Sequence, residues 1–144
     1  MTDAISSFGT FLKKGDGATP TETFATIAEV GDIEGPDMSL ATEEVTHHGS
    51  TGGWDEFVGT LLSGGEVTFP LNFLPSNATQ DGVTGLQADM KNRTRRNFQI
   101  VYPDAGSNGF AFAALVTGVK PKAPVKGKLA ADVKLKISGP VTEI

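Results

Sequence analysis

The sequence predicts a mainly β protein, a β-sandwich or barrel with one flanking α-helix. Runs of alternating apolar and polar residues recur along the 144-residue chain, which is typical of half-buried strands. The 18 glycines and 8 prolines indicate many turns, as all-β folds require. A chain of this length builds one hydrophobic core, so we expect a single domain over residues 1–144.

An N-terminal arm is expected over residues 1–22. Its apolar residues are spaced for a short helix, but the segment 8–14 equally suits a strand. The turn-forming sequence GDG and Pro20 end the segment in either case.

Strand-like alternation continues through the first half of the chain. Strands are predicted over residues 23–30, 38–46 and 66–73, with a turn at 31–36. In EVTFPLNF every second residue from Val67 to Phe73 is apolar and is expected to face the core. Pro70 lacks an amide proton, so we expect an edge or a bulge there.

One helix is predicted over residues 78–92, where apolar residues recur at helical spacing. Ser76 and Asn77 are its candidate N-caps. Gly82 and Gly85 each weaken a helix by about 1 kcal/mol, so packing on the sheet would have to stabilise it.

Three further strands are predicted, over residues 96–102, 110–119 and 128–138. In the last of them, alternate residues from Leu129 to Ile137 are expected in the core and lysines on the other face. Lysines on such a strand also guard a sheet edge against unwanted pairing.

The most unusual segment is THHGSTGGWDEFVGTLLSGGE, residues 46–66. It combines large apolar side chains, unsuited to a solvated loop, with six glycines, too many for a stable helix or strand. Apolar side chains on such a loop need a surface to bury against. We therefore expect an arm that becomes ordered on a neighbouring copy, with Trp54 and Phe57 as its anchors.

Charge is divided unevenly along the chain. Residues 1–66 contain 12 Asp and Glu against 2 Lys and Arg, a net −10, whereas residues 67–144 contain 5 against 10, a net +5. An acidic face meeting a basic face would suit head-to-tail stacking of copies. Ordinary solvated surface charge explains the division equally well.

The best candidate for nucleic-acid contact is the basic cluster Lys91, Arg93, Arg95 and Arg96. It lies at the end of the predicted helix, where cations are expected for electrostatic reasons, and only one aromatic residue is nearby. We therefore favour inter-subunit salt bridges for this cluster.

The residues give no support for catalysis, a metal or a cofactor. Cysteine is absent, and neighbouring His47 and His48 would point to opposite faces with no third ligand. Adjacent carboxylates such as Asp55 and Glu56 do not make a facing acid–base pair. No apolar run approaches the roughly 20 residues that span a membrane. The sequence favours a self-assembling structural protein over an enzyme.

The ordered series of segments resembles a known family, the major tail tube proteins of long, flexible-tailed phages of the lambda type. The resemblance runs from about Gly9 to Gly139 and is carried by FLKKGDG, ETFATIAEVGDIEGP and EEVTHHGSTGGWDEFVGTLLSGGEVTFPLNF, then by RRNFQIVYPD and FAALVTGVKPKAPVKGKLAADVKLKISG. The most specific part is GG-x-x-E-F-x-x-x-L-x-x-GGEV, which leads into an alternating strand.

This resemblance implies a fold shared with the type VI secretion tube protein and a subunit that forms hexameric rings. The rings would stack into the tail tube of a virion, assembled in the cytoplasm of a bacterial host. Double-stranded DNA would pass through the lumen without specific binding. The other expected partners are tail tip, tape measure and tail terminator proteins, with no membrane. Because the chain ends at Ile144, we expect no immunoglobulin-like C-terminal domain of the kind many such proteins carry.

The resemblance also implies that a long loop, residues 47–65, contacts neighbouring subunits. Its expected contact residues are His47, His48, Trp54, Asp55, Glu56, Phe57, Val58, Leu61 and Leu62. A lumen that releases DNA should be acidic, because each Lys or Arg near a phosphate adds affinity. The candidate lumen-facing acids are Glu43, Glu44 and Glu66.

Two alternatives remain. A tube subunit of a type VI secretion-like system would show the same pattern. A monomeric carbohydrate- or surface-binding β-sandwich module would need exposed aromatic residues on a rigid face, whereas Trp54 and Phe57 lie in the glycine-rich segment.

Overall fold

The computed structural model describes residues 2–144. Its elements are β1 (Phe11–Gly15), β2 (Phe24–Thr26), β3 (Ser39–Glu44), the short 3-10 turn η1 (Thr51–Gly53), β4 (Phe57–Ser63), β5 (Glu66–Asn72), α1 (Leu86–Lys91), β6 (Arg96–Val101), β7 (Gly109–Lys122) and β8 (Ala130–Glu143).

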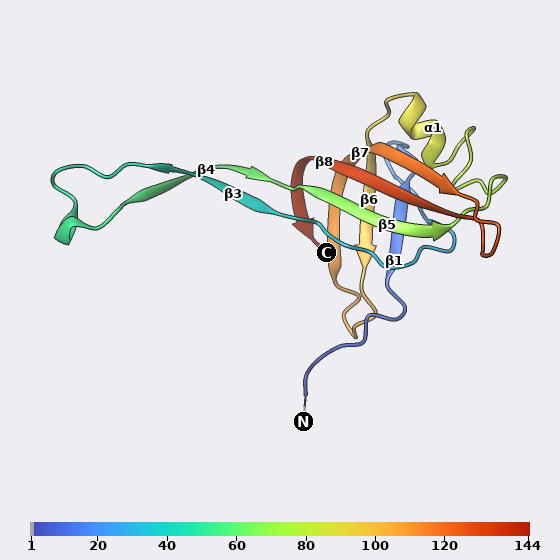
Figure 1. Cartoon of the computed structure of the whole chain (residues 1–144), viewed down its shortest axis with the longest axis horizontal. Coiled ribbons are helices and arrows are strands. Elements are labelled where there is room, and N and C mark those ends of the chain that lie inside the picture. The colour runs from blue at the N-terminus through green and yellow to red at the C-terminus, as the bar shows by residue number, and fades with distance from the viewer. Residues whose placement is uncertain (1) are drawn as a thin grey trace.

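Six strands form one antiparallel sheet in the order β2-β1-β6-β7-β8-β5. Strands β3 and β4 form a separate two-stranded sheet, which extends from the body as a long arm (Figure 1). The predicted mainly β architecture with one flanking helix is confirmed, although strand pairing does not close the large sheet into a barrel.

One segment, residues 24–34, connects the two edges of the six-stranded sheet. It first pairs with β1 as β2, with Thr26 opposite Lys13. Further along, the amides of Gly31 and Glu34 donate to carbonyl oxygens of β5 at 2.8 and 2.9 Å. The predicted turn at 31–36 is therefore wrong, because part of this segment is extended along β5. The predicted strand at 23–30 is likewise reduced to three residues and a single bridge at Val30.

Strand β5 confirms the expectation of a sheet edge at Pro70. The amides of Thr68 and Asn72, on either side of it, donate toward the 24–34 segment rather than toward β8. The amide proton that Pro70 lacks would have pointed the same way, so no hydrogen bond within the six-stranded sheet is lost.

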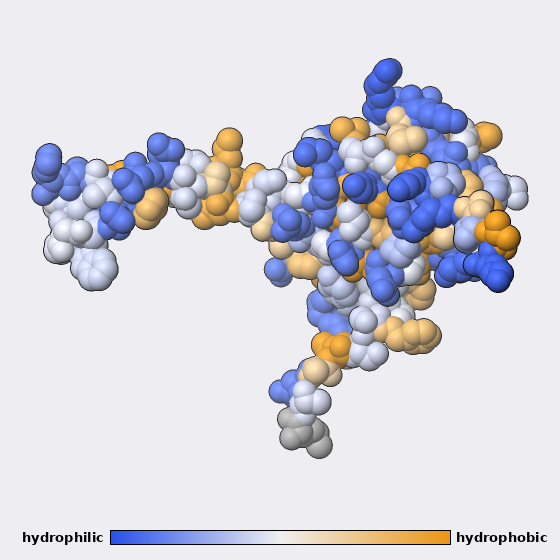
Figure 2. Space-filling model, viewed as in Figure 1, coloured by the Kyte–Doolittle hydropathy of each residue, from blue (hydrophilic) through white to orange (hydrophobic). Residues whose placement is uncertain are grey.

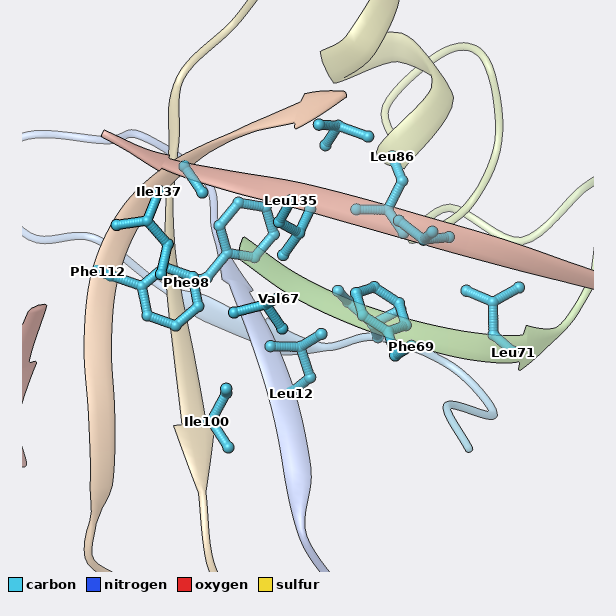
Figure 3. Close-up of a cluster of buried hydrophobic side chains, with 14 of the residues drawn as sticks. Leu12, Val67, Phe69, Leu71, Leu86, Phe98, Ile100, Phe112, Leu135 and Ile137 are labelled. Carbon is cyan, nitrogen blue, oxygen red and sulfur yellow. The ribbon is translucent and has the colours of Figure 1, made fainter. Parts of the chain in front are cut away.

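The core is formed by alternate residues of the sheet strands, with Leu86 of α1 packed against them (Figure 3). At its centre the rings of Phe98 and Phe112 stack with their centroids 6.1 Å apart. The predicted inward face of β8 is correct for four positions, but Leu129 precedes the strand and is exposed. Strand β8 lies between β7 and β5, so its lysines do not guard an edge as expected.

The helix is much shorter than predicted. Only residues 86–91 are α-helical, and the preceding residues form turns. A Cβ at Gly85 would lie 2.2 Å from the amide nitrogen of Asp81, so this backbone excludes any other residue there. The predicted N-cap Asn77 caps a turn rather than the helix, because its side-chain oxygen accepts a hydrogen bond from the Thr79 amide at 2.9 Å. The residue that precedes α1 is Gly85. Tertiary packing of Leu86, rather than helix propensity, holds this element.

We expect the turn before α1 to make stability depend on pH. The Thr84 amide is the main cause that lowers the pKa of Asp81 below its ordinary value, and the amides of Val83 and Gly85 act in the same direction. A lowered folded-state pKa stabilises the fold above the unfolded value of about 4, and this contribution disappears on further acidification. Urea unfolding should therefore show a smaller loss of stability between pH 5 and pH 2 for Asp81→Asn than for the wild type. Equal losses in the two proteins would contradict the expectation.

The N-terminal arm follows the strand alternative rather than the helical one. Residues 2–10 contain no helix, and β1 begins at Phe11. Ile5 and Phe8 are exposed, whereas Leu12 is buried in the core.

Candidate assembly site

The arm is built by the antiparallel pairing of β3 with β4. Leu40 lies opposite Leu62 near the body, and Glu44 lies opposite Phe57 farther out. The prediction that the segment 47–65 lacks secondary structure is wrong, because β4 occupies much of it. Pairing supplies the backbone hydrogen-bond partners that a loop would lack. The absence of a side chain at Gly59 leaves room for Leu40, because a Cβ added at Gly59 would lie 3.2 Å from Cδ2 of Leu40.

The arm buries none of its strand residues. Every residue of β3 and β4 is exposed, and Trp54, Leu61 and Leu62 are 77%, 79% and 82% exposed. An isolated two-stranded hairpin is at best marginally stable in water. Exposed apolar side chains in this density mark an interaction surface. Figure 2 shows apolar residues along the inner part of the arm and hydrophilic residues toward its outer part.

The tip of the arm is held by polar contacts around Glu56. Its side chain accepts a hydrogen bond from the Ser50 hydroxyl and lies 3.5 Å from Nε2 of His47. The Glu56 amide donates to the hydroxyl of Thr46 at 2.8 Å. His47 therefore contributes to the turn; over residues 2–144 no cluster of three His, Asp or Glu side chains suits a metal ion.

Two glycines fix the point where the arm leaves the body. A Cβ at Gly64 would lie 2.4 Å from Cγ2 of Ile137, so the arm root packs directly on β8. Gly65 has φ of +73°, and its carbonyl accepts the Ile137 amide at 3.0 Å. Beside this root is a mainly apolar groove of about 680 Å³, lined by arm and β8 residues that include Met38, Leu62 and Val141.

The three candidate acids do not come together. Glu43 and Glu44 lie on β3 in the arm, whereas Glu66 begins β5 in the body, opposite Lys136. All three side chains are exposed. The structure thus separates an acidic arm from a single acid at the sheet edge.

The basic cluster divides into two parts. Lys91, Arg93 and Arg95 are exposed and available to a partner. Arg96 instead acts within its own subunit, because its Nε lies 3.0 Å from Oδ1 of Asp89 and its guanidinium also donates to the carbonyl of Asp16. Its predicted inter-subunit role is corrected accordingly.

Sequence reasoning missed the buried ionic cluster that Arg96 joins. Lys14 Nζ lies 2.9 Å from Oδ2 of Asp89, and both residues are buried. Lys14 also donates to the carbonyl of Thr84 at 2.7 Å, which ties β1 to the turn before α1. The available signal was a lysine two residues after Leu12, on the apolar face of a strand.

Comparison with known proteins gives a consistent picture. A family model described as "Lambda phage tail tube protein, TTP" matches residues 12–142. The fold is similar to a chain of the virion of a native gene transfer agent particle, with a TM-score of 0.72, 19% identity, and coverage of 98% of this chain and 99% of the other. A tail chain of an empty gene transfer agent particle, refined with C6 symmetry, gives a TM-score of 0.71 at 20% identity, covering 96% and 98%.

A chain of the sheath–tube complex of an extracellular contractile injection system is also similar, with a TM-score of 0.69 at 13% identity and coverage of 99% of this chain and 92% of the other. No curated protein matches the sequence. In the part of the chain that is described, no helix has the length and apolar character needed to cross a membrane.

Proposed function

The chain belongs to the lambda phage tail tube protein family and is a structural subunit of a virion tail tube; from this premise we propose that it assembles into stacked hexameric rings that enclose a channel for DNA. The observation that carries the proposal is the arm, whose strands bury nothing within the subunit. Its apolar residues gain burial only against another molecule, and a copy of the same chain is the simplest such partner.

The number of subunits in a ring is supported by the similar tail of a gene transfer agent particle, which was refined with C6 symmetry. The other similar structures include a sheath/tube terminator and a baseplate, which supports tail terminator and tail tip proteins as partners at the ends of the tube. A tape measure protein is the further partner that we expect. The role is architectural, without catalysis, metal or cofactor. Residues 47–65, with anchors Trp54 and Phe57, would make the inter-subunit contacts, and Lys91, Arg93 and Arg95 would contribute salt bridges.

Negative-stain electron microscopy of the purified chain tests this function directly. Concentrated protein is expected to form hollow rods with a sixfold cross-section, in equilibrium with soluble subunits at low concentration. A protein that stays monomeric at every concentration, and fails to join tails grown from a tail tip complex, would contradict the proposal.

An acidic lumen is a second consequence. Of the three candidate acids, Glu43 and Glu44 lie on the arm, whereas Glu66 lies on the body of the subunit. We therefore expect Glu66 to keep the channel wall negative, so that the duplex is repelled and slides. Glu66→Lys should slow genome delivery by about tenfold, because each cation near a phosphate adds salt-dependent affinity. Delivery can be followed by DNA release from assembled particles, with tail length as the control for assembly. Unchanged delivery from tails of normal length would remove Glu66 from the lumen.

A tube subunit of a contractile injection system is the competing function. It is favoured by the similarity to a chain of the sheath–tube complex of an extracellular contractile injection system, and to chains of the baseplate and the tube-terminating cap of the anti-feeding prophage, at 12 to 13% identity. The two functions differ in the contents of the tube. Particles assembled with this subunit should contain DNA in the first case and protein effectors in the second.

A further inference from the structure

The two ends of the molecule differ in both shape and charge. The arm extends from one end of the long axis, and the loop that joins β7 to β8 lies at the opposite end (Figure 1). A contact between unlike ends of identical molecules is heterologous, and repeats from copy to copy until it closes into a ring or continues as a filament. The chemistry of the two ends therefore determines whether such a contact is favourable.

The outer part of the arm is acidic. Its four carboxylates, Glu43, Glu44, Asp55 and Glu56, are brought together because Glu44 lies opposite Phe57 and the Glu56 carbonyl accepts the Val45 amide at 2.8 Å. No Lys or Arg occurs between Lys14 and Lys91, so the arm has no strong cation of its own. Within residues 2–144, the sole ion pair of these four acids is the 3.5 Å contact of Glu56 with His47.

The opposite end is basic. Residues 120–128, with the sequence KPKAPVKGK, complete β7 and form the loop before β8. Its four lysines are all exposed, and the nearby Asp132 pairs with Lys122 at 2.9 Å, which leaves a net charge of +3. At the centre of the loop Val125 is 103% exposed. This end therefore offers an apolar side chain surrounded by uncompensated cations.

We propose that the β7–β8 end, residues 120–128, is the receiving surface for the outer part of the arm of the next copy. The inference rests on the proposed self-assembly and adds the identity of the receiving surface. The acidic outer part of the arm of one copy lies against the lysines of the next, and the exposed Trp54 and Val125 supply the apolar part of the contact. Pro121 and Pro124 cannot donate backbone hydrogen bonds, so side-chain charge rather than strand addition defines the contact.

Cysteine cross-linking tests the proximity, since the wild-type chain contains no cysteine. A subunit with both Asp55→Cys and Val125→Cys is expected to give, on mild oxidation under assembly conditions, a ladder of trimers and larger products. Each single variant can give dimers at most, because a subunit with one cysteine forms only one disulfide. The matched control combines Asp55→Cys with Arg93→Cys, at the other basic cluster. No ladder from the 55/125 variant under conditions in which it assembles, or a ladder of equal yield from the control, would overturn the proposal.

Charge reversal tests the energetics. Glu43→Lys with Glu44→Lys, or Lys126→Glu with Lys128→Glu, should raise the concentration needed for assembly by roughly tenfold or more, through repulsion between like charges. Combining the four changes restores opposite charges and should restore assembly. The matched control combines the arm reversal with Arg93→Glu and Arg95→Glu. Rescue by this control instead, or rescue by neither combination, would overturn the assignment.

The outcomes separate this inference from the function on which it rests. If the wild type forms no tubes, the proposed function fails. If the wild type forms tubes and reversal of Lys126 and Lys128 leaves the assembly concentration unchanged, the function stands and the receiving surface is elsewhere. Circular dichroism confirms that each variant is folded, and the exposed position of these side chains gives no reason for the fold to change.

Discussion

Replacement of Trp54 and Phe57 by alanine is expected to leave a folded subunit that forms no tubes. Both side chains are exposed on the arm and do not belong to the hydrophobic core, so the free energy of unfolding should change by less than about 0.5 kcal/mol. Aromatic anchors at the centre of an interface typically contribute about 2 to 4 kcal/mol each. Because every subunit uses its arm, loss of these contacts should raise the assembly concentration by at least about a hundredfold.

Sedimentation and electron microscopy at increasing protein concentration measure this effect. Val83→Ala provides the matched control, since Val83 is 81% exposed but lies on the turns before α1. The control should assemble as the wild type does. Tubes of normal yield from the double variant would show that these aromatic residues are not the anchors of the arm.

The buried carboxylate of Asp89 carries the largest expected effect on stability. It receives Lys14 Nζ at 2.9 Å and Arg96 Nε at 3.0 Å while being only 3% exposed. Asp89→Ala leaves two cations facing each other in a site with little water. Breaking a buried ion pair from one side typically costs about 3 to 5 kcal/mol, which is a large share of the roughly 5 to 15 kcal/mol of a domain.

Urea unfolding of Asp89→Ala and of the control Asp132→Ala measures how much more stability is lost when the broken ion pair is buried. Asp132 pairs with Lys122 at the same distance, 2.9 Å, but both side chains are about half exposed. A surface pair of this kind contributes about 0 to 1 kcal/mol. Equal losses in the two variants would show that burial adds nothing at Asp89, and the ionic cluster would then not be what holds β1, β6 and α1 together.

Much of the architecture could be predicted from local pattern. The alternation in EVTFPLNF identified β5 and its buried residues Val67, Phe69 and Leu71, since side chains of a strand point alternately to opposite faces. The same period predicted β6, β7 and β8 to within a few residues of their ends, apart from the long extensions of β7 and β8. The order of segments also identified the tail tube family, which the family model confirms.

Other features depend on contacts between distant residues. The helix was predicted too long because spacing alone does not reveal that Gly85 adopts an extended backbone, with φ of −93° and ψ of −162°, which interrupts a continuous helix. The arm was expected to lack secondary structure because its glycines disfavour a strand in isolation, yet β3 supplies partners for β4. Arg96 was assigned to a neighbouring subunit, since nothing in the sequence places it beside Asp89.

The β class, the inward faces of the long strands, the family and the presence of an apolar segment without a partner can all be predicted from the order and spacing of residues along the chain. Three features emerge only from the folded molecule: this segment is a paired arm, Lys14, Asp89 and Arg96 share a buried site, and the acidic and basic ends lie at opposite extremes of the molecule. These depend on which distant residues the fold brings together or holds apart, and pairing energies act through space rather than along the sequence.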